Sequence, residues 1–235
     1  MLRLAVASPA RLSDRSSARS PLFRPAFRGI HPLTSLPAMN DGNSLTGETT
    51  SSEAFERRYR QKPDPWDFAT SSYELGRYDS MLNALSRATY RLIYEPGCSV
   101  GVLTERLSRI AERVIAADFA PSAVAQAQQR CARLWNVEFE VADVRHFVPA
   151  ERPDLIVFSE IGYYFPVHEV GRIGRFLGEQ LAPGGELLAV HWLGCSGDHV
   201  LHGDEVHEKL RETLPLAWIT GARREGFRLD SWRKQ

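Results

Sequence analysis

The sequence predicts an α/β fold, in which a doubly wound, mostly parallel sheet carries helices on both faces and ends in an antiparallel hairpin. Apolar strand patterns alternate with helical patterns along residues 53–235, which is typical of a parallel sheet. Near the C-terminus, strand patterns at 216–223 and 227–232 flank Arg224-Glu225-Gly226, a sequence that indicates a hairpin. The chain has 235 residues, 43% of them apolar and 25% charged, so one large globular domain is expected.

Before the hairpin, the strand patterns are short and apolar. They are expected at residues 93–95, 113–118, 137–143, 153–160 and 186–192. The third strand alternates apolar and polar residues, and the fourth is almost entirely apolar, as in a strand that is covered on both faces.

Helical patterns separate these strands. After the first strand, helical spacing is shown by Leu103, Leu107, Ile110 and Val114. A second helix is expected over 120–134, because Pro121 is suited to a first helical turn. Two more helices are expected, one ending before Pro183 and one at 204–214, and the buried face of the former is formed by Val170, Ile173, Leu177 and Leu181.

Residues 1–52 differ from the rest in composition. They are rich in Ser, Pro and Arg and have no sustained apolar period, which predicts a disordered tail. Two alternatives are an organelle transit peptide, with its Arg-rich and acid-poor composition, and a start codon assigned too early, with Met39 as the true start. The domain is therefore expected at 53–235, with residues 53–90 forming a helical lid.

Bulk properties limit the partners. The formal net charge is zero, and no apolar run is long enough to span a membrane, so neither a nucleic-acid partner nor a membrane span is expected. The three cysteines have no C-x-x-C spacing, which indicates reduced thiols and a cytoplasmic location, with an organelle as the minor alternative.

The sequence EPGCSVG, from Glu95 to Gly101, lies at the end of the first strand and has three interpretations: a nucleophile elbow, a glycine-rich nucleotide loop, and an ordinary strand-to-helix turn. It matches G-x-S-x-G, but the nucleophile elbow of α/β-hydrolases follows several strands, and this loop follows the first. A glycine-rich nucleotide loop fits better, because Gly97 allows a tight turn and Gly101 allows close packing of helix on strand. Between these glycines lie Cys98 and Ser99.

The charge of Glu95 bears on the ligand of this loop. A carboxylate would repel a pyrophosphate and attract a cation. S-adenosylmethionine carries a sulfonium and an ammonium group and has no phosphate, so the sign of this charge favours it over NAD.

Two further acids end strands. Asp118 lies 21 residues after Gly97 and is placed to accept hydrogen bonds from ribose hydroxyls, with Phe119 beside it. Asp143 ends the third strand, where it and Val144 would meet the adenine. Because ligands bind at the carboxyl ends of parallel strands, Ser159 is also a candidate. The alternative for each acid is a solvated loop residue or a helix cap.

With these residues the chain resembles the class I S-adenosylmethionine-dependent methyltransferases and, within them, the nodulation protein S family. The family resemblance is carried by PDPWDFATSSYE, EPGCSVGVLTERL, DLIVFSEIGYYF, LAPGGELLAVHW, GDEVH and FRLDSW. It covers about 180 residues from Phe55 onward. The resemblance implies a Rossmann-like, seven-stranded sheet whose last strand is antiparallel, and methyl transfer to a free amine of an oligosaccharide. Residues 1–52 are not part of the family pattern, and Leu75-Gly76-Arg77-Tyr78 stands where the family is usually more basic.

Candidate lid residues precede the sheet. Trp66 and Tyr73 can place aromatic faces beside a sulfonium, a cation–π attraction of about 0.5–2 kcal/mol. The alternative for Trp66 is an anchor that holds the lid in the core. Arg77 suits the cofactor carboxylate, and its alternative is an exposed helix arginine.

Candidates for binding and deprotonating the acceptor follow the fourth and fifth strands. They are Glu160, Tyr163, Tyr164 and His191. Glu160 would also bind an ammonium group. The alternatives are packing for the two tyrosines and a satisfied core histidine for His191.

Residues 198–207 invite a metal interpretation. They contain His199, His202 and His207 near Asp198, Asp204 and Glu205. The spacing matches no standard template, so a solvated loop on the substrate side is predicted and no metal is expected.

The leading hypothesis is an S-adenosylmethionine-dependent N-methyltransferase of an amino sugar, oligosaccharide or other small amine. The alternatives are O- or C-methylation of a small metabolite, an NAD-dependent oxidoreductase, and a non-catalytic binding protein.

Overall fold

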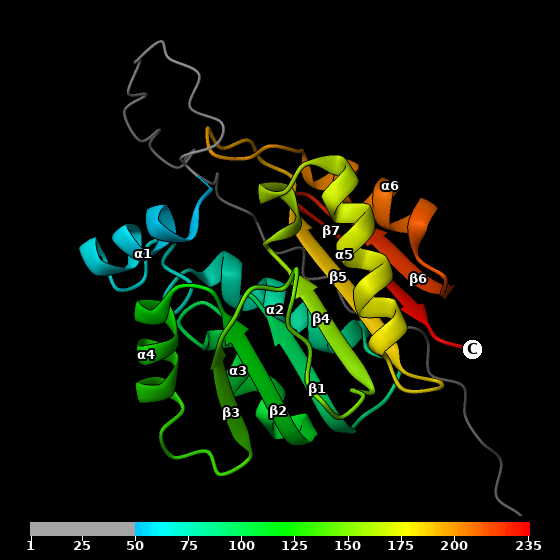
Figure 1. Ribbon diagram of the computed structural model, residues 1–235, viewed down its shortest axis with the longest axis horizontal. Coiled ribbons are helices and arrows are strands. Elements are labelled where there is room, and N and C mark those ends of the chain that lie inside the picture. Colours follow the sequence, from blue (N-terminus) through cyan, green and yellow to red (C-terminus); the bar gives the residue numbers. More distant parts are fainter. Residues whose placement is uncertain (1–49) are drawn as a thin grey trace, which may run out of the picture. The chain divides into compact units, whose positions relative to one another are not determined.

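The computed structural model describes residues 50–235, and the expectations for residues 1–49 lie outside this range. Seven strands form one sheet in these residues, in the order β3-β2-β1-β4-β5-β7-β6 (Figure 1). The strands are β1 (Tyr90–Pro96), β2 (Ala111–Asp118), β3 (Val137–Val141), β4 (Leu155–Ser159), β5 (Glu186–Trp192), β6 (Ala217–Arg223) and β7 (Phe227–Arg233).

Five strands are parallel, and β7 runs antiparallel to both of its neighbours, β5 and β6. The order reverses between β1 and β4, which makes the carboxyl ends of these two strands the expected ligand site. The predicted fold class, with seven strands and an antiparallel last strand, is confirmed.

Helices cover both faces of the sheet. They are α1 (Ser52–Gln61), α2 (Ser72–Ala84), α3 (Val102–Leu107), α4 (Pro121–Arg130), α5 (Val167–Gln180) and α6 (Gly203–Thr213). Short 3₁₀ turns lie at η1 (Ser108–Ile110) and η2 (Gly162–Tyr164). No helix of the described residues is long and apolar enough to cross a membrane.

Alternation along the strands separates two apolar cores. On β4, Val157 packs with side chains of α1 to α4, whereas Phe158 packs with side chains of α5 and α6. Strand β5 divides in the same way between Leu188 and Leu187. Both cores are fully buried at these strands, which accounts for the nearly continuous apolar sequence of β4.

One predicted element boundary was wrong. Val114 continues the helical spacing of Leu103 and Leu107, but it lies inside β2 and is fully buried there. The helix after the glycine loop ends at Leu107, and η1 leads directly into the strand. Val114 packs in the core from β2. A buried apolar residue fits a helix or a strand at this position, so its apolar character alone did not decide between them.

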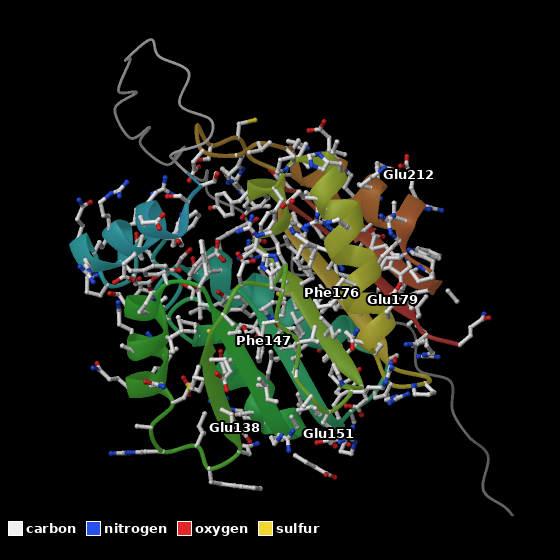
Figure 2. All side chains as sticks on the ribbon, viewed as in Figure 1. Glu138, Phe147, Glu151, Phe176, Glu179 and Glu212 are labelled. Carbon is white, nitrogen blue, oxygen red and sulfur yellow. The ribbon has the colours of Figure 1, made fainter. Side chains whose placement is uncertain are left out.

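The arrowheads of the parallel strands point to the side of the molecule on which α1 lies (Figure 1). At the opposite, amino end of the strands, Arg113 forms ion pairs with Glu138 and Glu151 at 3.6 Å and 3.0 Å. Figure 2 shows both glutamates at that lower edge of the sheet. The two glutamate side chains are 60% and 46% exposed, so we expect these pairs to contribute little to stability.

Candidate active site

A small cavity of about 30 Å³ lies at the carboxyl ends of β1 and β4. Its lining brings together the glycine loop, the end of β4 and the lid, and includes Glu95, Gly97, Cys98, Ser99, Ser159, Glu160, Phe68 and Tyr78. The segments that the sequence suggested separately for cofactor and acceptor therefore meet in one place.

The glycine loop is bent by three residues with left-handed backbone. Gly97 and Gly101 each have φ 78°, and Ser99 has φ 49°. A Cβ at Gly97 would lie 2.5 Å from Ile161 Cγ2, and one at Gly101 would lie 3.0 Å from the backbone of Ala127. Both positions thus require glycine, for the turn and for close helix packing. Ser99 holds the same backbone form at a cost, and such strain occurs where a site needs it.

Glu95 lies at the end of β1 with its carboxylate buried. Its Oε2 accepts a hydrogen bond of 2.6 Å from the Thr104 hydroxyl on α3. Burial raises the pKa of Glu95 to about 8, and the bond from Thr104 offsets only part of that effect. The carboxyl of Glu95 is therefore largely protonated at neutral pH in the ligand-free site.

Asp118 ends β2, beside the glycine loop. Its carboxylate accepts hydrogen bonds from the backbone N–H of Ser99 at 3.0 Å and of Ala120 at 2.9 Å. Burial raises the pKa of Asp118 to about 6 despite these bonds. The side chain of Asp118 fixes the loop on which Ser99 lies. Phe119, the next residue, packs on Phe55 of α1 with ring centroids 5.3 Å apart.

Asp143 and Val144 come two residues after β3. Burial opposes ionisation of Asp143, but hydrogen bonds from Arg145 outweigh it and lower its pKa. The shortest of these, to Asp143 Oδ2, is 2.5 Å. Val144 is buried in the core formed with α5 and α6. Asp143 thus lies two residues beyond the strand that it was expected to end, and it has an arginine partner that the sequence does not indicate. The contact of Asp143 and Val144 with the adenine stays a prediction.

The lid is helical only in part. Helix α1 is followed by an irregular segment, 62–71, and then by α2. Trp66 lies in the irregular segment and packs on Phe55, Tyr59 and Phe68 with ring centroids 5.5–5.9 Å apart. This arrangement is that of the anchoring alternative. Phe68, two residues later, is the aromatic residue of this segment that lines the cavity.

Helix α1 is attached to the cofactor side of the sheet by polar contacts. The Tyr59 hydroxyl donates a 2.7 Å hydrogen bond to Ser99 Oγ on the glycine loop. Glu56 accepts bonds from the backbone N–H and hydroxyl of Ser122 at the start of α4. Arg58 pairs with Asp198 at 2.5 Å, which ties α1 to the loop after β5.

Arg77 lies on α2 and is fully buried, so the exposed-helix alternative is wrong. Its guanidinium pairs with Glu160 Oε1 at 2.6 Å and also with Glu74. Burial raises the pKa of Glu74 to about 7, and Arg77 counters only part of the rise. The expected partner, a cofactor carboxylate, would have to share the guanidinium with two carboxylates of the chain. Tyr73, one turn before it, is 39% exposed, and its hydroxyl approaches Gly226 of the hairpin.

Glu160 directly follows β4 in the left-handed conformation, with φ 61°. Its N–H donates to Val190 O at 3.0 Å, and its Oε2 accepts a 2.5 Å hydrogen bond from the Tyr163 hydroxyl. With Arg77 on the other oxygen, the carboxylate is held from both sides at the cavity wall. A residue with a Cβ in this backbone form at a strand end indicates a constrained site.

The two tyrosines of η2 differ in exposure. Tyr163 is buried and stacks on His199 with ring centroids 3.9 Å apart. Tyr164 is half-buried and packs edge-on against Phe55 of α1, at 4.9 Å. Burial raises the pKa of both phenols, so both are neutral, and the phenol of Tyr164 stands between lid and acceptor side.

His191 is fully buried within β5 rather than after it. Its Nε2 accepts a hydrogen bond from the N–H of Gly162, and its Nδ1 lies 3.2 Å from His207 Nε2. Burial and the neighbouring His207 hold the pKa of His191 well below its ordinary value. Both ring nitrogens have partners in the chain, as the core-histidine alternative requires.

Residues 198–207 do not converge on one point. His207 lies in α6 and faces Asp230, His202 caps α6 together with Glu205, and His199 lies on Tyr163. Among residues 50–235 no group of three histidine, cysteine or acidic side chains is arranged to hold a metal ion.

Comparison with known proteins decides the family. A family model described as nodulation protein S (NodS) matches residues 50–188. The chain belongs to this family. Nodulation protein S of Sinorhizobium fredii is 31% identical over 156 residues, which is 64% of this chain and 72% of that protein. Its counterpart in Bradyrhizobium diazoefficiens is 33% identical over 127 residues, 53% of this chain and 61% of that protein.

Solved structures agree with this placement. The crystal structure of N-methyltransferase NodS from Bradyrhizobium japonicum in complex with S-adenosyl-L-homocysteine has a TM-score of 0.69 at 26% identity, and the match covers 78% of this chain and 98% of that one. A putative methyltransferase from Pseudomonas syringae has a TM-score of 0.61 at 32% identity, covering 70% and 100%. The protein is thus an S-adenosylmethionine-dependent methyltransferase, and the hydrolase and NAD interpretations of the glycine loop are excluded.

Sequence analysis missed several residues of the site. Tyr59 and Phe68 contact the glycine loop or the cavity, Thr104 holds Glu95, and Glu74 shares Arg77. A signal existed for Tyr59, since Phe55 and Tyr59 are four residues apart on an otherwise charged helix. Nothing in the sequence marks Thr104 or Glu74.

Proposed function

We propose that this methyltransferase of the NodS type N-methylates a free amine on an amino sugar, an oligosaccharide or another small molecule. The observation that carries the proposal is the position of Glu160. Its carboxylate lines the same cavity as the glycine loop, and the backbone strain and two side-chain partners described above hold it there.

The charge of the site suits cationic ligands. Glu95 and Glu160 line the cavity. Asp118 accepts a hydrogen bond from the backbone N–H of the lining residue Ser99, and Glu74 pairs with Arg77. Glu160 and Glu74 pair with Arg77, whereas Glu95 and Asp118 have no cationic partner among residues 50–235. An excess of acidic groups in a buried site favours binding of an amine in its ammonium form.

The residues around the glycine loop fit S-adenosylmethionine. The left-handed turn from Gly97 to Gly101 brings backbone close to a ligand, and carboxyl groups follow three adjacent strands at Glu95, Asp118 and Asp143. Glu95 would hold the ammonium group, Asp118 with Phe119 the ribose, and Asp143 with Val144 the adenine. The loop residues Cys98 and Ser99 and the strand-end residue Ser159 complete this set. When bound, the cofactor supplies an activated methyl group.

Cofactor entry requires the lid to move. A small-molecule site has a volume of roughly 300–1,000 Å³, whereas the cavity measures about 30 Å³. Phe68 of the irregular lid segment lines the cavity, and helix α1 is tied to the surrounding loops by the Tyr59–Ser99 and Arg58–Asp198 contacts. We therefore propose that this lid opens, with Tyr73 and Arg77 facing the cofactor once it is bound and Trp66 anchoring the closed lid.

The chain contributes two steps to the chemistry. Glu160 binds the acceptor ammonium and takes up one of its protons, because only the neutral amine has a lone pair for attack. The Tyr163 hydroxyl and Arg77 orient the carboxylate for that task. Tyr164 contacts the lid residue Phe55 and would bound the acceptor on the other side. Holding the amine in line with the methyl group supplies most of the rate increase.

The names of the relatives support the amine. The solved relative from Bradyrhizobium japonicum is named an N-methyltransferase, and the curated relatives are nodulation proteins. We therefore infer a free amine of a partly deacetylated chitooligosaccharide as the first acceptor to test.

We also propose a cytoplasmic location, since Cys98 and Cys131 are buried free thiols of the described chain. Cell fractionation would test it, and recovery in an organelle fraction would contradict it.

Mass spectrometry of an acceptor panel tests the function. Partly deacetylated chitooligosaccharides are incubated with enzyme and S-adenosylmethionine, beside their fully acetylated counterparts as the matched control. We expect a gain of one methyl group on the free amine and none on the acetylated sugar. Methylation of a hydroxyl or carbon acceptor instead would refute N-methylation.

A pair of variants tests the role of Glu160. We expect Glu160→Gln to lower kcat/KM by roughly 10²-fold or more, the usual size of a general-base effect. Asp79→Asn is the control, since Asp79 is an exposed carboxylate of α2 that pairs only with Arg106 among the described residues. Equal activities of the two variants would remove Glu160 from the mechanism.

A further inference from the structure

Three side chains form a continuous hydrogen-bonded line through the interior, away from the glycine loop. The line, called here the histidine chain, consists of His191 on β5, His207 on α6 and Asp230 on β7. His191 Nδ1 lies 3.2 Å from His207 Nε2, and His207 Nδ1 lies 2.7 Å from Asp230 Oδ2. Both histidines have no exposed surface, and Asp230 is buried as well.

The protons in the histidine chain follow from its two ends. At one end the N–H of Gly162 can only donate, so His191 Nε2 accepts this 3.0 Å bond and the ring proton of His191 is on Nδ1. That proton is donated to His207 Nε2, and His207 then carries its own proton on Nδ1. At the other end the Asp230 carboxylate accepts that proton's hydrogen bond. Every ring nitrogen is used and both imidazoles are neutral.

The charges agree with this assignment. Burial lowers the pKa of both histidines. Burial disfavours ionisation of Asp230, but the bond from His207 and the charge of Arg228 outweigh it and lower its pKa. Asp230 also accepts a 2.8 Å bond from Arg228 Nε and a 3.3 Å bond from Trp218 Nε1. The carboxylate is thus anchored on β7, which lies between β5 and the edge strand β6.

The near end of the histidine chain supports the acceptor side of the site. Gly162 begins η2, the turn that carries Tyr163 and Tyr164 and follows Glu160. A Cβ at Gly162 would lie 2.6 Å from His191 Nε2 and 2.6 Å from Val206 Cγ1, so the turn is pressed directly on the imidazole. The backbone that holds Glu160 in its left-handed form therefore rests on His191.

We propose that His191, His207 and Asp230 are positioning residues that hold the Glu160–Tyr164 turn in the geometry needed for the acceptor. A proton relay does not fit the same contacts, because the line ends at a backbone N–H that cannot accept a proton from the acceptor. His191 consequently acts through Gly162 and is not the general base.

Two amide variants of His191 distinguish the effect of its hydrogen bond from Gly162 from the effect of its hydrogen bond to His207. The oxygen of Gln in His191→Gln reaches the place of Nε2 and can still accept from Gly162. In His191→Asn the shorter amide reaches only the place of Nδ1. This variant keeps the hydrogen bond to His207 and loses the one from the N–H of Gly162. Both remove the imidazole and both bury one amide, so each is the control of the other.

The proposal rests on the proposed function only for the choice of acceptor, a partly deacetylated chitooligosaccharide. We expect His191→Gln, which keeps the bond from Gly162 and loses the bond to His207, to lose only part of its kcat/KM for the acceptor. His191→Asn should lose roughly tenfold to 10²-fold in kcat/KM for the acceptor, because small misplacements of a reacting group are costly. The affinity for S-adenosylhomocysteine and the shape of the pH–rate profile should change in neither variant.

Several results would overturn the proposal. Equal losses in the two amide variants would indicate a purely structural role, and loss of the acidic limb of the pH–rate profile would make His191 a base. If His191→Asn does not fold, ¹⁵N NMR of the imidazoles in the unmodified protein decides. Neutral rings protonated on Nδ1 at neutral pH support the histidine chain, and a charged or Nε2-protonated His191 refutes it. This measurement needs no acceptor, so it stands even if no chitooligosaccharide is methylated.

Discussion

Substitution of Glu95 by glutamine tests the idea that this site was built for a cation. In the ligand-free protein, burial raises the pKa of Glu95 from 4.5 to about 8. The folded chain therefore binds this proton more tightly than the unfolded chain does. Below pH 4.5 the carboxyl is neutral in both states and costs nothing, and the cost grows as pH rises towards 8.

The magnitude follows from the size of the shift. Each pKa unit corresponds to about 1.4 kcal/mol, so a shift of this size amounts to a cost on the order of 5 kcal/mol above pH 8. Glu95→Gln should remove most of this cost. We therefore expect the variant to gain stability over the unmodified protein as pH rises from 5 to 8, as measured by urea unfolding without ligand.

Cofactor binding should have the opposite effect to burial on the protonation of Glu95. A bound ammonium group stabilises ionised Glu95, so binding releases a proton wherever the free carboxyl is protonated. Between pH 6.5 and 7.5 the affinity for S-adenosylhomocysteine should rise by up to about tenfold from this group. Titration calorimetry in buffers of different ionisation enthalpy measures both the affinity and the released proton.

The comparison needs a matched buried carboxyl. Glu186 is buried in β5 and bonded to Ser86, Tyr90 and Ser231, at the other end of the strand from the site. Glu186→Gln should leave the slope of affinity against pH unchanged, whereas Glu95→Gln should bind more weakly and lose it. A slope that survives in Glu95→Gln, or an affinity that does not vary with pH in the unmodified enzyme, would show that Glu95 does not face the cation.

Three further changes give distinct outcomes. Asp118→Ala should weaken S-adenosylhomocysteine binding by about 1.5–3 kcal/mol, the value of hydrogen bonds to a charged group, and calorimetry showing an unchanged affinity would contradict the ribose placement. Gly101→Ala should lower the free energy of unfolding by about 1–2 kcal/mol or more, because a left-handed alanine is strained and its Cβ would lie 3.0 Å from the backbone of Ala127. Urea midpoints that coincide for the two proteins would refute this reasoning. Tyr59→Phe removes the bond to Ser99 and should speed cofactor dissociation by several-fold in stopped-flow measurements, as expected from loss of about 0.5–1.5 kcal/mol in the closed lid. A dissociation rate equal to that of the unmodified protein would mean that this contact does not hold the lid.

Local sequence patterns determined the framework of this protein. The apolar run of β4 and the alternation of β3 predict strands because periodicity reports which faces are buried. Gly97 and Gly101 were identifiable because left-handed turns need glycine, and Asp118 because a fixed number of residues separates it from the loop. These features depend on neighbours in the chain, so the sequence is enough to find them.

Contacts between distant segments decided the rest. The sequence could not show that Arg77 meets Glu160, that Tyr59 reaches Ser99, or that His191 is enclosed by Gly162 and His207. Each of these pairs joins residues that are far apart in the sequence, and Gly162 and His191 meet because β4 and β5 are neighbours in the sheet. The sequence shows that residue 95 is an acid, but whether the carboxyl of Glu95 is protonated depends on its burial in the folded chain. Burial and partners are properties of the folded chain, and for that reason the ligand class came from the sequence and the ionisation and support of the site came from the tertiary structure.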